Sequence, residues 1–196
     1  MKLESEIEKF REMDSLRYYF IGDSLVKEIF HRYPSNKNED EVILKVRLLD
    51  SFYGTNLEMS HMVVPMAKHI VQCSKNKNLD EHIEKGSFAA VCLIAEVNKY
   101  NYLSFASKYC CNSNFADSYF IYDSIVSSIM YDFTKEHKDL FKDRITKDSL
   151  KDYEKYCFVC KEYKRVNNLE GSNRDMDWFL WCKRKMEDNN YVLCSV

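Results

Sequence analysis

Apolar side chains recur at helical spacing along most of this chain. Between Ser15 and Tyr33 they stand three or four positions apart, and Pro34 then ends the pattern. A second helical segment begins near Glu41. Only four glycines and two prolines occur in 196 residues, which is too few for a fold of many hairpins and turns. The pattern therefore predicts an all-α protein.

Two further helices are expected in the middle of the chain. Gly54 and Thr55 indicate the end of one helix and the start of the next, which carries apolar residues over 59–70. Pro65 either kinks that helix or marks a fresh first turn. Residues 85–97 form another helix, and a helix bearing Lys108 follows it.

Two capping-box patterns open the last two predicted helices. Ser149 precedes Asp152 by three residues, and Ser172 precedes Asp175 in the same way, so each pair can exchange hydrogen bonds with backbone N–H groups. Neither helix can bury its apolar stripe alone. We therefore expect both to pack on the preceding helices as a C-terminal pair.

The length is that of one domain. We expect a single helical domain over residues 1–196, with a core at about 15–133 and the C-terminal helices at about 148–188. Hydrophobic residues make up 45% of the chain, which is enough for a sizeable core. The formal charge of −2 gives no general attraction to nucleic acid, so a nucleic-acid site needs a local basic patch.

Cellular location is predicted from what the chain lacks. No run of 18 apolar residues occurs, so we expect no transmembrane helix and no membrane partner. The charged start MKLESEIEKFREMDS has no apolar signal-peptide core. We therefore predict a cytoplasmic protein whose eight cysteines are reduced thiols.

The stretch SFASKYCCNSNFADSYFIYDSIV places an amine and a carboxylate on two helices joined by a short connection. Lys108 lies on the first helix, and Asp123 stands at the start of the second. A lysine becomes a nucleophile when burial lowers its pKa. A carboxylate can stabilise a developing cation, which suits chemistry at a sugar carbon that loses its base. Equally, Asp123 has the position of a simple N-cap, and Lys108 that of a surface residue.

The order of these elements resembles that of helix-hairpin-helix DNA glycosylases. In that family an apolar helix ends in a polar patch, as VILKVRLLDSFYGTNL does here. A later helix carries a lysine, turn residues follow, and an aspartate opens the next helix; ASKYCCNSNFADSYFIYDSIV is similar. The same stretch, with YGTN upstream and DMDWFLW near the end, also resembles a group of small bacterial proteins of no established function.

This resemblance covers about Glu41 to Phe133 and implies a compact multi-helix fold with base-excision chemistry on DNA. By resemblance, Lys108 attacks the sugar or steers a water, and Asp123 stabilises the cationic transition state. No cofactor is expected. The candidate substrate-binding residues are Tyr53, Asn56, Asn112, Asn114 and Tyr122.

Two other kinds of function stay open. The first is a non-catalytic interaction module of a defence or regulatory system. Trp178 and Trp181 offer a partner-binding face for it, although they also suit a docked terminal helix. The second is a thiol or metal protein built on Cys157 and Cys160, whose spacing fits metal ligands. These cysteines share an apolar stripe, which favours core packing, and we predict no metal site.

Overall fold

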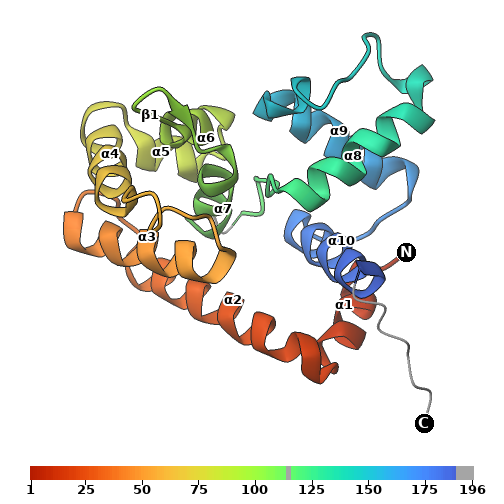
Figure 1. The fold of residues 1–196 in the computed structure, drawn as a ribbon, viewed down its shortest axis with the longest axis horizontal. Coiled ribbons are helices and arrows are strands. Elements are labelled where there is room, and N and C mark those ends of the chain that lie inside the picture. The colour runs from red at the N-terminus through yellow and green to blue at the C-terminus, as the bar shows by residue number, and fades with distance from the viewer. Residues whose placement is uncertain (114–115, 189–196) are drawn as a thin grey trace.

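Helix α2, Asp14–Arg32, runs along one side of the molecule and connects its two halves (Figure 1). The computed structural model describes residues 1–113 and 116–188. One half holds α3 (Glu39–Tyr53), α4 (Val63–Asn76), α5 (Leu79–Glu84), α6 (Phe88–Ala95) and α7 (Leu103–Ser113). The other half holds α1 (Leu3–Arg11), α8 (Ser124–Glu136), α9 (Tyr153–Val166) and α10 (Asn173–Asp188). The prediction of a mainly helical protein is confirmed for the described residues.

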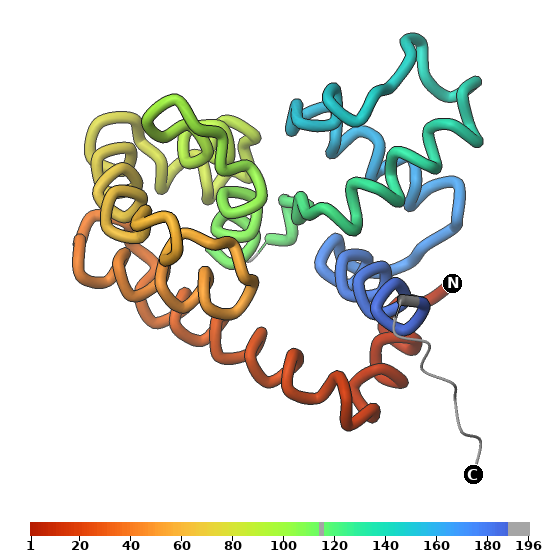
Figure 2. The backbone as a smooth tube through the Cα atoms, viewed as in Figure 1, coloured from red at the N-terminus to blue at the C-terminus, as the bar shows by residue number. Residues whose placement is uncertain are grey.

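The N-terminal helix belongs with the C-terminal half of the chain (Figure 2). Helix α1 packs on α10. The N-terminal ammonium of Met1 donates a hydrogen bond to the Asn168 carbonyl at 2.6 Å, and the Leu3 N–H donates to the Glu170 carbonyl at 2.9 Å. The first and last helices of the described chain therefore pack together in one half of the molecule, and α2 leads from this half to the other.

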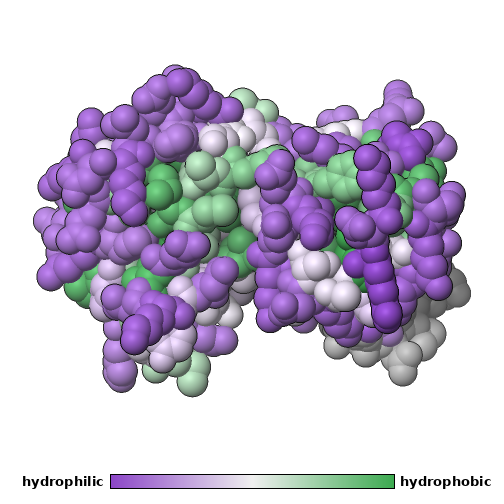
Figure 3. All heavy atoms as spheres, turned by 90° about the horizontal axis from the view of Figure 1, so that it is seen from above, coloured by the Kyte–Doolittle hydropathy of each residue, from purple (hydrophilic) through white to green (hydrophobic). Residues whose placement is uncertain are grey.

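Hydrophobic side chains form one core that includes members of both halves. Seen from above, hydrophilic residues cover most of the surface, and hydrophobic residues show through on both halves of this face (Figure 3). In the described ranges, no helix is both long enough and apolar enough to cross a bilayer.

The start of α4 differs from its prediction. We expected a helix from Thr55, but residues 55–62 form turns and α4 begins at Val63. The Asp50 carboxylate accepts hydrogen bonds from the N–H groups of Leu57 and Glu58 at 2.9 and 2.8 Å. These bonds stabilise the turns. Pro65 lies in the first turn of α4, where its missing N–H costs nothing.

A short hairpin takes the place of the last turn predicted for residues 85–97. Strand β1 (Glu96–Val97) pairs antiparallel with β2 (Tyr100–Asn101). The two residues between them, Asn98 and Lys99, have φ angles of 49° and 70°. Such left-handed pairs form the tight turns that suit hairpins. Helix α6 therefore ends at Ala95.

One of the two predicted capping boxes is present. Ser172 and Asp175 exchange hydrogen bonds at 2.8 and 2.9 Å at the start of α10. The prediction for Ser149 and Asp152 is wrong. Ser149 instead pairs with Thr146 before a short 3₁₀ turn (Ser149–Lys151), and Asp152 alone caps α9 through the Lys155 N–H. A second 3₁₀ turn (Lys138–Leu140) follows α8.

Candidate functional site

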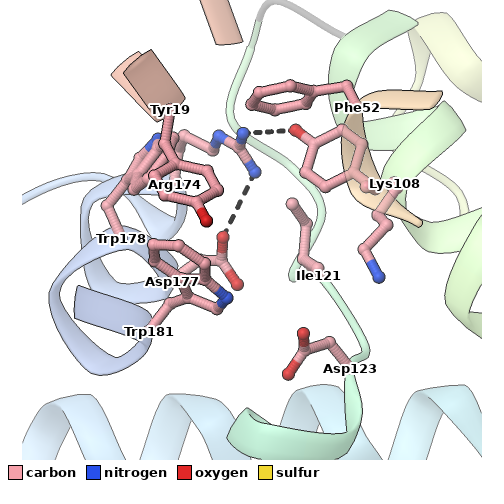
Figure 4. Close-up of a pocket in the computed structure, with 10 residues that line it drawn as sticks. Tyr19, Phe52, Lys108, Ile121, Asp123, Arg174, Asp177, Trp178 and Trp181 are labelled. Atoms are coloured by element: carbon pink, nitrogen blue, oxygen red, sulfur yellow. Dashed lines mark hydrogen bonds and ion pairs between the residues drawn. The ribbon is translucent and has the colours of Figure 1, made fainter. Parts of the chain in front are cut away.

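A pocket opens where the two halves meet (Figure 4). Its cavity measures about 90 Å³, which is room for several water molecules. Aromatic side chains and charged groups line it in nearly equal number. The lining residues are Tyr19, Phe52, Tyr53, Lys108, Ile121, Asp123, Arg174, Asp177, Trp178 and Trp181.

A wider cleft of about 460 Å³ adjoins this cavity. Tyr53, Lys108 and Asp123 line both spaces, so they stand at the boundary between the inner cavity and the outer cleft. Beyond them the cleft is lined mostly by hydroxyl and amine side chains. Its other lining residues are Gly54, Ser104, Tyr122, Ser124, Ser127, Ser128, Lys147, Leu150 and Lys151.

Lys108 is a buried amine with one hydrogen-bond partner in the described structure. Its residue is 5% exposed, and Nζ donates to the Ser104 hydroxyl, one turn earlier on α7, at 2.8 Å. Nζ also lies 5.5 Å from the centre of the Tyr53 ring. Burial lowers the pKa of Lys108, and the carboxylates of Asp123 and Asp177 only partly oppose that effect.

The second buried lysine differs from Lys108. Lys45 is 1% exposed, and its Nζ donates to the carbonyls of Tyr33 and Ser35 at 3.0 Å each and to Asn36 Oδ1 at 2.6 Å. Burial lowers its pKa to about 8. All three ammonium hydrogens are used inside the core, which is a structural role. Lys108 keeps two hydrogens for a ligand.

Asp123 combines both of the roles considered for it. Its Oδ1 accepts hydrogen bonds from the N–H groups of Ile125 and Val126 at 2.8 and 2.9 Å, so it is the N-cap of α8. The residue is half-buried and lines both spaces. In Figure 4 its carboxylate and the Lys108 amine approach the same region beside Ile121. The capping bonds therefore hold a carboxylate at the pocket.

A buried ionic network forms the opposite wall and joins α2, α3 and α10. The Arg174 guanidinium donates through Nη2 to Asp23 Oδ1 and to the Tyr53 hydroxyl. Trp178 Nε1 also donates to Asp23, at 3.3 Å, and Lys27 forms an ion pair with it at 3.0 Å. Burial alone would raise the pKa of Asp23, but the charges of Arg174 and Lys27 hold it below its ordinary value.

Asp177 is a second pocket carboxyl. Its side chain is 14% exposed and pairs with Arg174 Nη1 at 3.2 Å. Burial raises its pKa to about 7 despite that attraction. Arg174 also serves Asp23, so its charge is shared, and Asp123 adds a repulsive negative charge. The pocket thus holds a carboxyl that gains and loses a proton near neutral pH.

Aromatic rings line the pocket from three helices. Tyr19 on α2 and Trp181 on α10 meet edge to face at 4.9 Å between ring centres, and Trp181 meets Trp178 at 5.7 Å. On α3, Phe52 contacts Tyr53 at 4.7 Å. Such rings offer π-faces to a flat ligand.

The other candidate residues fall into different places. Tyr122 lines the outer cleft. Asn112 is buried behind the pocket and donates to the Lys108 carbonyl at 2.8 Å and the Tyr53 hydroxyl at 3.4 Å, so it positions these residues and is not a lining residue. Asn56 is exposed in the turn after α3 and lines neither space. Asn114 lies outside the described residues.

Sequence reasoning missed much of the wall formed by α10. Arg174 and Asp177 were not candidates, although Trp178 and Trp181 were noted. A signal existed in RDMDWFLW, where two charged and two aromatic residues recur at spacings of three, on one helical face. The sequence alone does not show which distant helices this face of α10 packs against.

Cys157, Cys160 and Cys111 are poorly placed to act as metal ligands or nucleophiles. Cys157 and Cys160 lie in the hydrophobic core. Burial raises the pKa of Cys157 to about 12 and that of Cys111 to about 11, so the reactive thiolate is disfavoured. Within the described residues, no group of three or more potential ligands is placed to hold a metal ion. The thiol and metal hypothesis therefore gains no support from the geometry.

Comparison with known proteins gives one match. A family model, HI_0787_N, described as an N-terminal domain, matches residues 2–117 of the 196-residue chain. No curated protein and no solved structure matches. The matched segment contributes Tyr19, Phe52, Tyr53 and Lys108 to the pocket, and the rest of the lining comes from residues beyond it.

Proposed function

We propose that this chain, which belongs to the HI_0787_N family, binds DNA and performs base-excision chemistry with Lys108 as the nucleophile. The observation that carries this proposal is a buried lysine with one hydrogen-bond partner, placed beside a capping carboxylate at the mouth of an aromatic pocket. Buried amines of this kind lose their proton readily and attack electrophilic carbon.

The pocket supports a flat, partly polar ligand such as a nucleobase. Trp181, Tyr19 and Phe52 offer ring surfaces for stacking, and Asp177 and Arg174 offer hydrogen-bonding groups among them. The inner cavity is small, so entry of a base requires some opening between the halves. The outer cleft then accommodates the sugar next to Lys108 and Asp123.

The proposed reaction balances with groups already in the pocket. The neutral Lys108 nitrogen bonds to C1′ of the deoxyribose while the glycosidic bond breaks, and the base leaves with the electron pair. The Asp177 carboxyl gives its proton to the base and regains one from the attached nitrogen. The Asp123 carboxylate stabilises the positive charge that grows on the sugar.

Borohydride trapping on abasic DNA tests this proposal. At an abasic site the Lys108 amine condenses with the sugar aldehyde, releases water and leaves an iminium that borohydride reduces to a stable amine. Wild-type protein should yield a covalent complex, and Lys108→Ala should yield none. The control is Lys75→Ala, which replaces an exposed lysine near the end of α4 and should trap as wild type does. Equal trapping by all three proteins would contradict the proposal.

A protein-binding module is the second candidate, and one surface feature favours it. Tyr18, Ile21 and Leu25 form an outward stripe on α2 and are 77%, 50% and 52% exposed. Their spacing of three and four residues places them on one helical face. Exposed apolar stripes of this kind often contact another protein.

Sedimentation velocity distinguishes this second candidate. If the stripe pairs two copies of the chain, wild-type protein should sediment as a dimer and Leu25→Lys as a monomer. Trapping at Lys108 should be absent in that case. If wild-type protein sediments as a monomer, the stripe does not serve self-association.

A further inference from the structure

A third cleft, of about 510 Å³, lies in the half of the molecule formed by α8 and α9. Four of its lining side chains are cationic and one is anionic. It is lined by Tyr131, Thr134, Lys135, Lys138, Phe141, Lys142, Asp143, Arg144 and Ile145. We call it the basic cleft. A concave surface with this excess of positive charge attracts anions even though the whole chain carries a charge of −2.

Three of these cations are available to a ligand. Lys138, Lys142 and Arg144 are exposed and form no ion pair within the described residues. Lys135, in contrast, pairs with Asp132 at 2.5 Å. Unpaired cations that surround one hollow repel one another, and an anion that enters the hollow relieves this repulsion.

The basic cleft lies beside the outer cleft of the candidate site. Lys135 and Lys147 approach the Tyr131 ring, with Nζ atoms 4.6 and 5.4 Å from its centre. Tyr131 lines the basic cleft, whereas Lys147 lines the outer cleft beside Lys108. Lys147 therefore links the two spaces, and positive charge extends from the pocket mouth to the loop after α8.

We infer that the basic cleft holds the phosphate backbone of a DNA strand whose nucleotide enters the pocket. The identity of this ligand rests on the proposed function. The basic cleft lies next to the outer cleft and its aromatic pocket, and this arrangement favours DNA over a lipid surface, because a flat membrane does not enter two neighbouring clefts. Phosphate contacts from Lys138, Lys142 and Arg144 would position the strand without reading its sequence.

Fluorescence anisotropy with a duplex that contains a stable abasic-site analogue tests the inference. The cleft variant replaces Lys138, Lys142 and Arg144 by Gln. The control variant replaces three exposed lysines of the other half, Lys37, Lys75 and Lys77, by Gln, with the same change in net charge. The cleft variant should bind roughly tenfold or more weakly, and its salt slope should fall by about 2 to 3. The control should stay within about twofold of wild type.

Several outcomes would overturn the inference. Unchanged DNA affinity in the cleft variant would do so. An equal loss of affinity in the control variant would also do so, because it would show that only the net charge of the protein matters. Tighter binding of anionic phospholipid vesicles than of DNA, lost in the cleft variant, would assign the cleft to membranes. If Lys108 is trapped and the cleft variant binds DNA as tightly as wild type, the phosphate contacts of the basic cleft are contradicted and the proposed function is not. If the cleft variant binds DNA more weakly but wild-type protein gives no trapped complex, the chemistry proposed for Lys108 is contradicted and the basic cleft is not.

Discussion

At the scale of residues, the two buried lysines show how similar burial leads to different roles. Lys45 satisfies its ammonium with three oxygen atoms of the chain, whereas Lys108 has the Ser104 hydroxyl alone among the described residues. A buried charge with few partners carries a desolvation cost that is not returned by contacts. Such a residue lowers the stability of the fold, and binding of a ligand would explain its presence.

Substitution by Met separates these roles. Lys45→Met should lower the free energy of unfolding by roughly 2 to 4 kcal/mol, because it leaves the buried carbonyls of Tyr33 and Ser35 without their donor and removes one of the two donors to Asn36 Oδ1. Lys108→Met should leave the free energy of unfolding unchanged or raise it, because it removes a buried amine with a single hydrogen-bond partner among the described residues. Urea unfolding of both variants measures the difference. A larger loss in Lys108→Met than in Lys45→Met would contradict this account of the two amines.

Asp177 should give the protein a characteristic pH dependence. Its pKa is about 7 in the folded chain against an ordinary value of 3.8, so the folded state binds more protons between those values. Its contribution to stability therefore falls as pH rises from about 4 to about 7. Asp177→Asn should gain stability relative to wild type over this range, by up to about 4 kcal/mol, since a tenfold change in proton affinity is worth about 1.4 kcal/mol.

Thermal or urea unfolding at pH 4, 5, 6 and 8 measures this difference. Asp132→Asn, on the exposed face of α8, is the matched control and should run parallel to wild type. A constant difference between Asp177→Asn and wild type across the series would show that the Asp177 carboxyl keeps an ordinary pKa.

At the scale of elements, Gly22 sets how closely α2 approaches α3. A Cβ at this position would come within 2.3 Å of Cε2 of Phe52, which lines the pocket. Gly22→Ala should therefore destabilise by about 1 to 3 kcal/mol, even though Ala is the better helix former. Phe52→Leu in the same chain should restore part of the loss, as a double-mutant cycle would reveal. If the free-energy changes of the two substitutions are additive, the Cβ at position 22 and the Phe52 ring are not in steric conflict.

Local patterns predicted two helix starts that depend on one or two polar side chains. The Asp123 cap and the Ser172–Asp175 capping box were both readable because their partners lie within three residues. The start of α4 was not, because it depends on an Asp50 carboxylate that accepts bonds seven and eight residues away. The hairpin after α6 was also missed, since a Lys in a left-handed turn is an uncommon signal.

At the scale of the whole molecule, the pocket exists because two halves meet. The sequence indicated Lys108, Asp123 and Tyr53 as candidates, and the structure places all three at one boundary. It did not indicate Arg174, because its partners Asp23 and Tyr53 lie more than a hundred residues away in sequence. Asp177 pairs with Arg174 on the same helix, and only the packing of that helix brings it to the pocket. Contacts of that range follow from packing and not from local pattern. The catalytic role of Lys108 and Asp123 stays a prediction.

Arg174 should be the residue whose loss most weakens the contact between the halves. It joins Asp23 of α2 and Tyr53 of α3 to α10. Arg174→Met leaves the buried Asp23 carboxylate without its main partner, which should cost about 3 to 5 kcal/mol. Asp23→Asn in the same chain should recover part of that loss. Hydrogen exchange should rise in α10 first, and protection that stays unchanged there would contradict this role.

The central claim is that Lys108 is the reactive amine of this molecule, and peptide mapping after reductive trapping tests it most directly. Wild-type protein is reduced with borohydride on an abasic duplex, digested and analysed by mass spectrometry for the lysine that carries the sugar. The account predicts the adduct on Lys108, in the peptide that ends α7. Adducts spread over exposed lysines, or confined to any lysine other than Lys108, would contradict it.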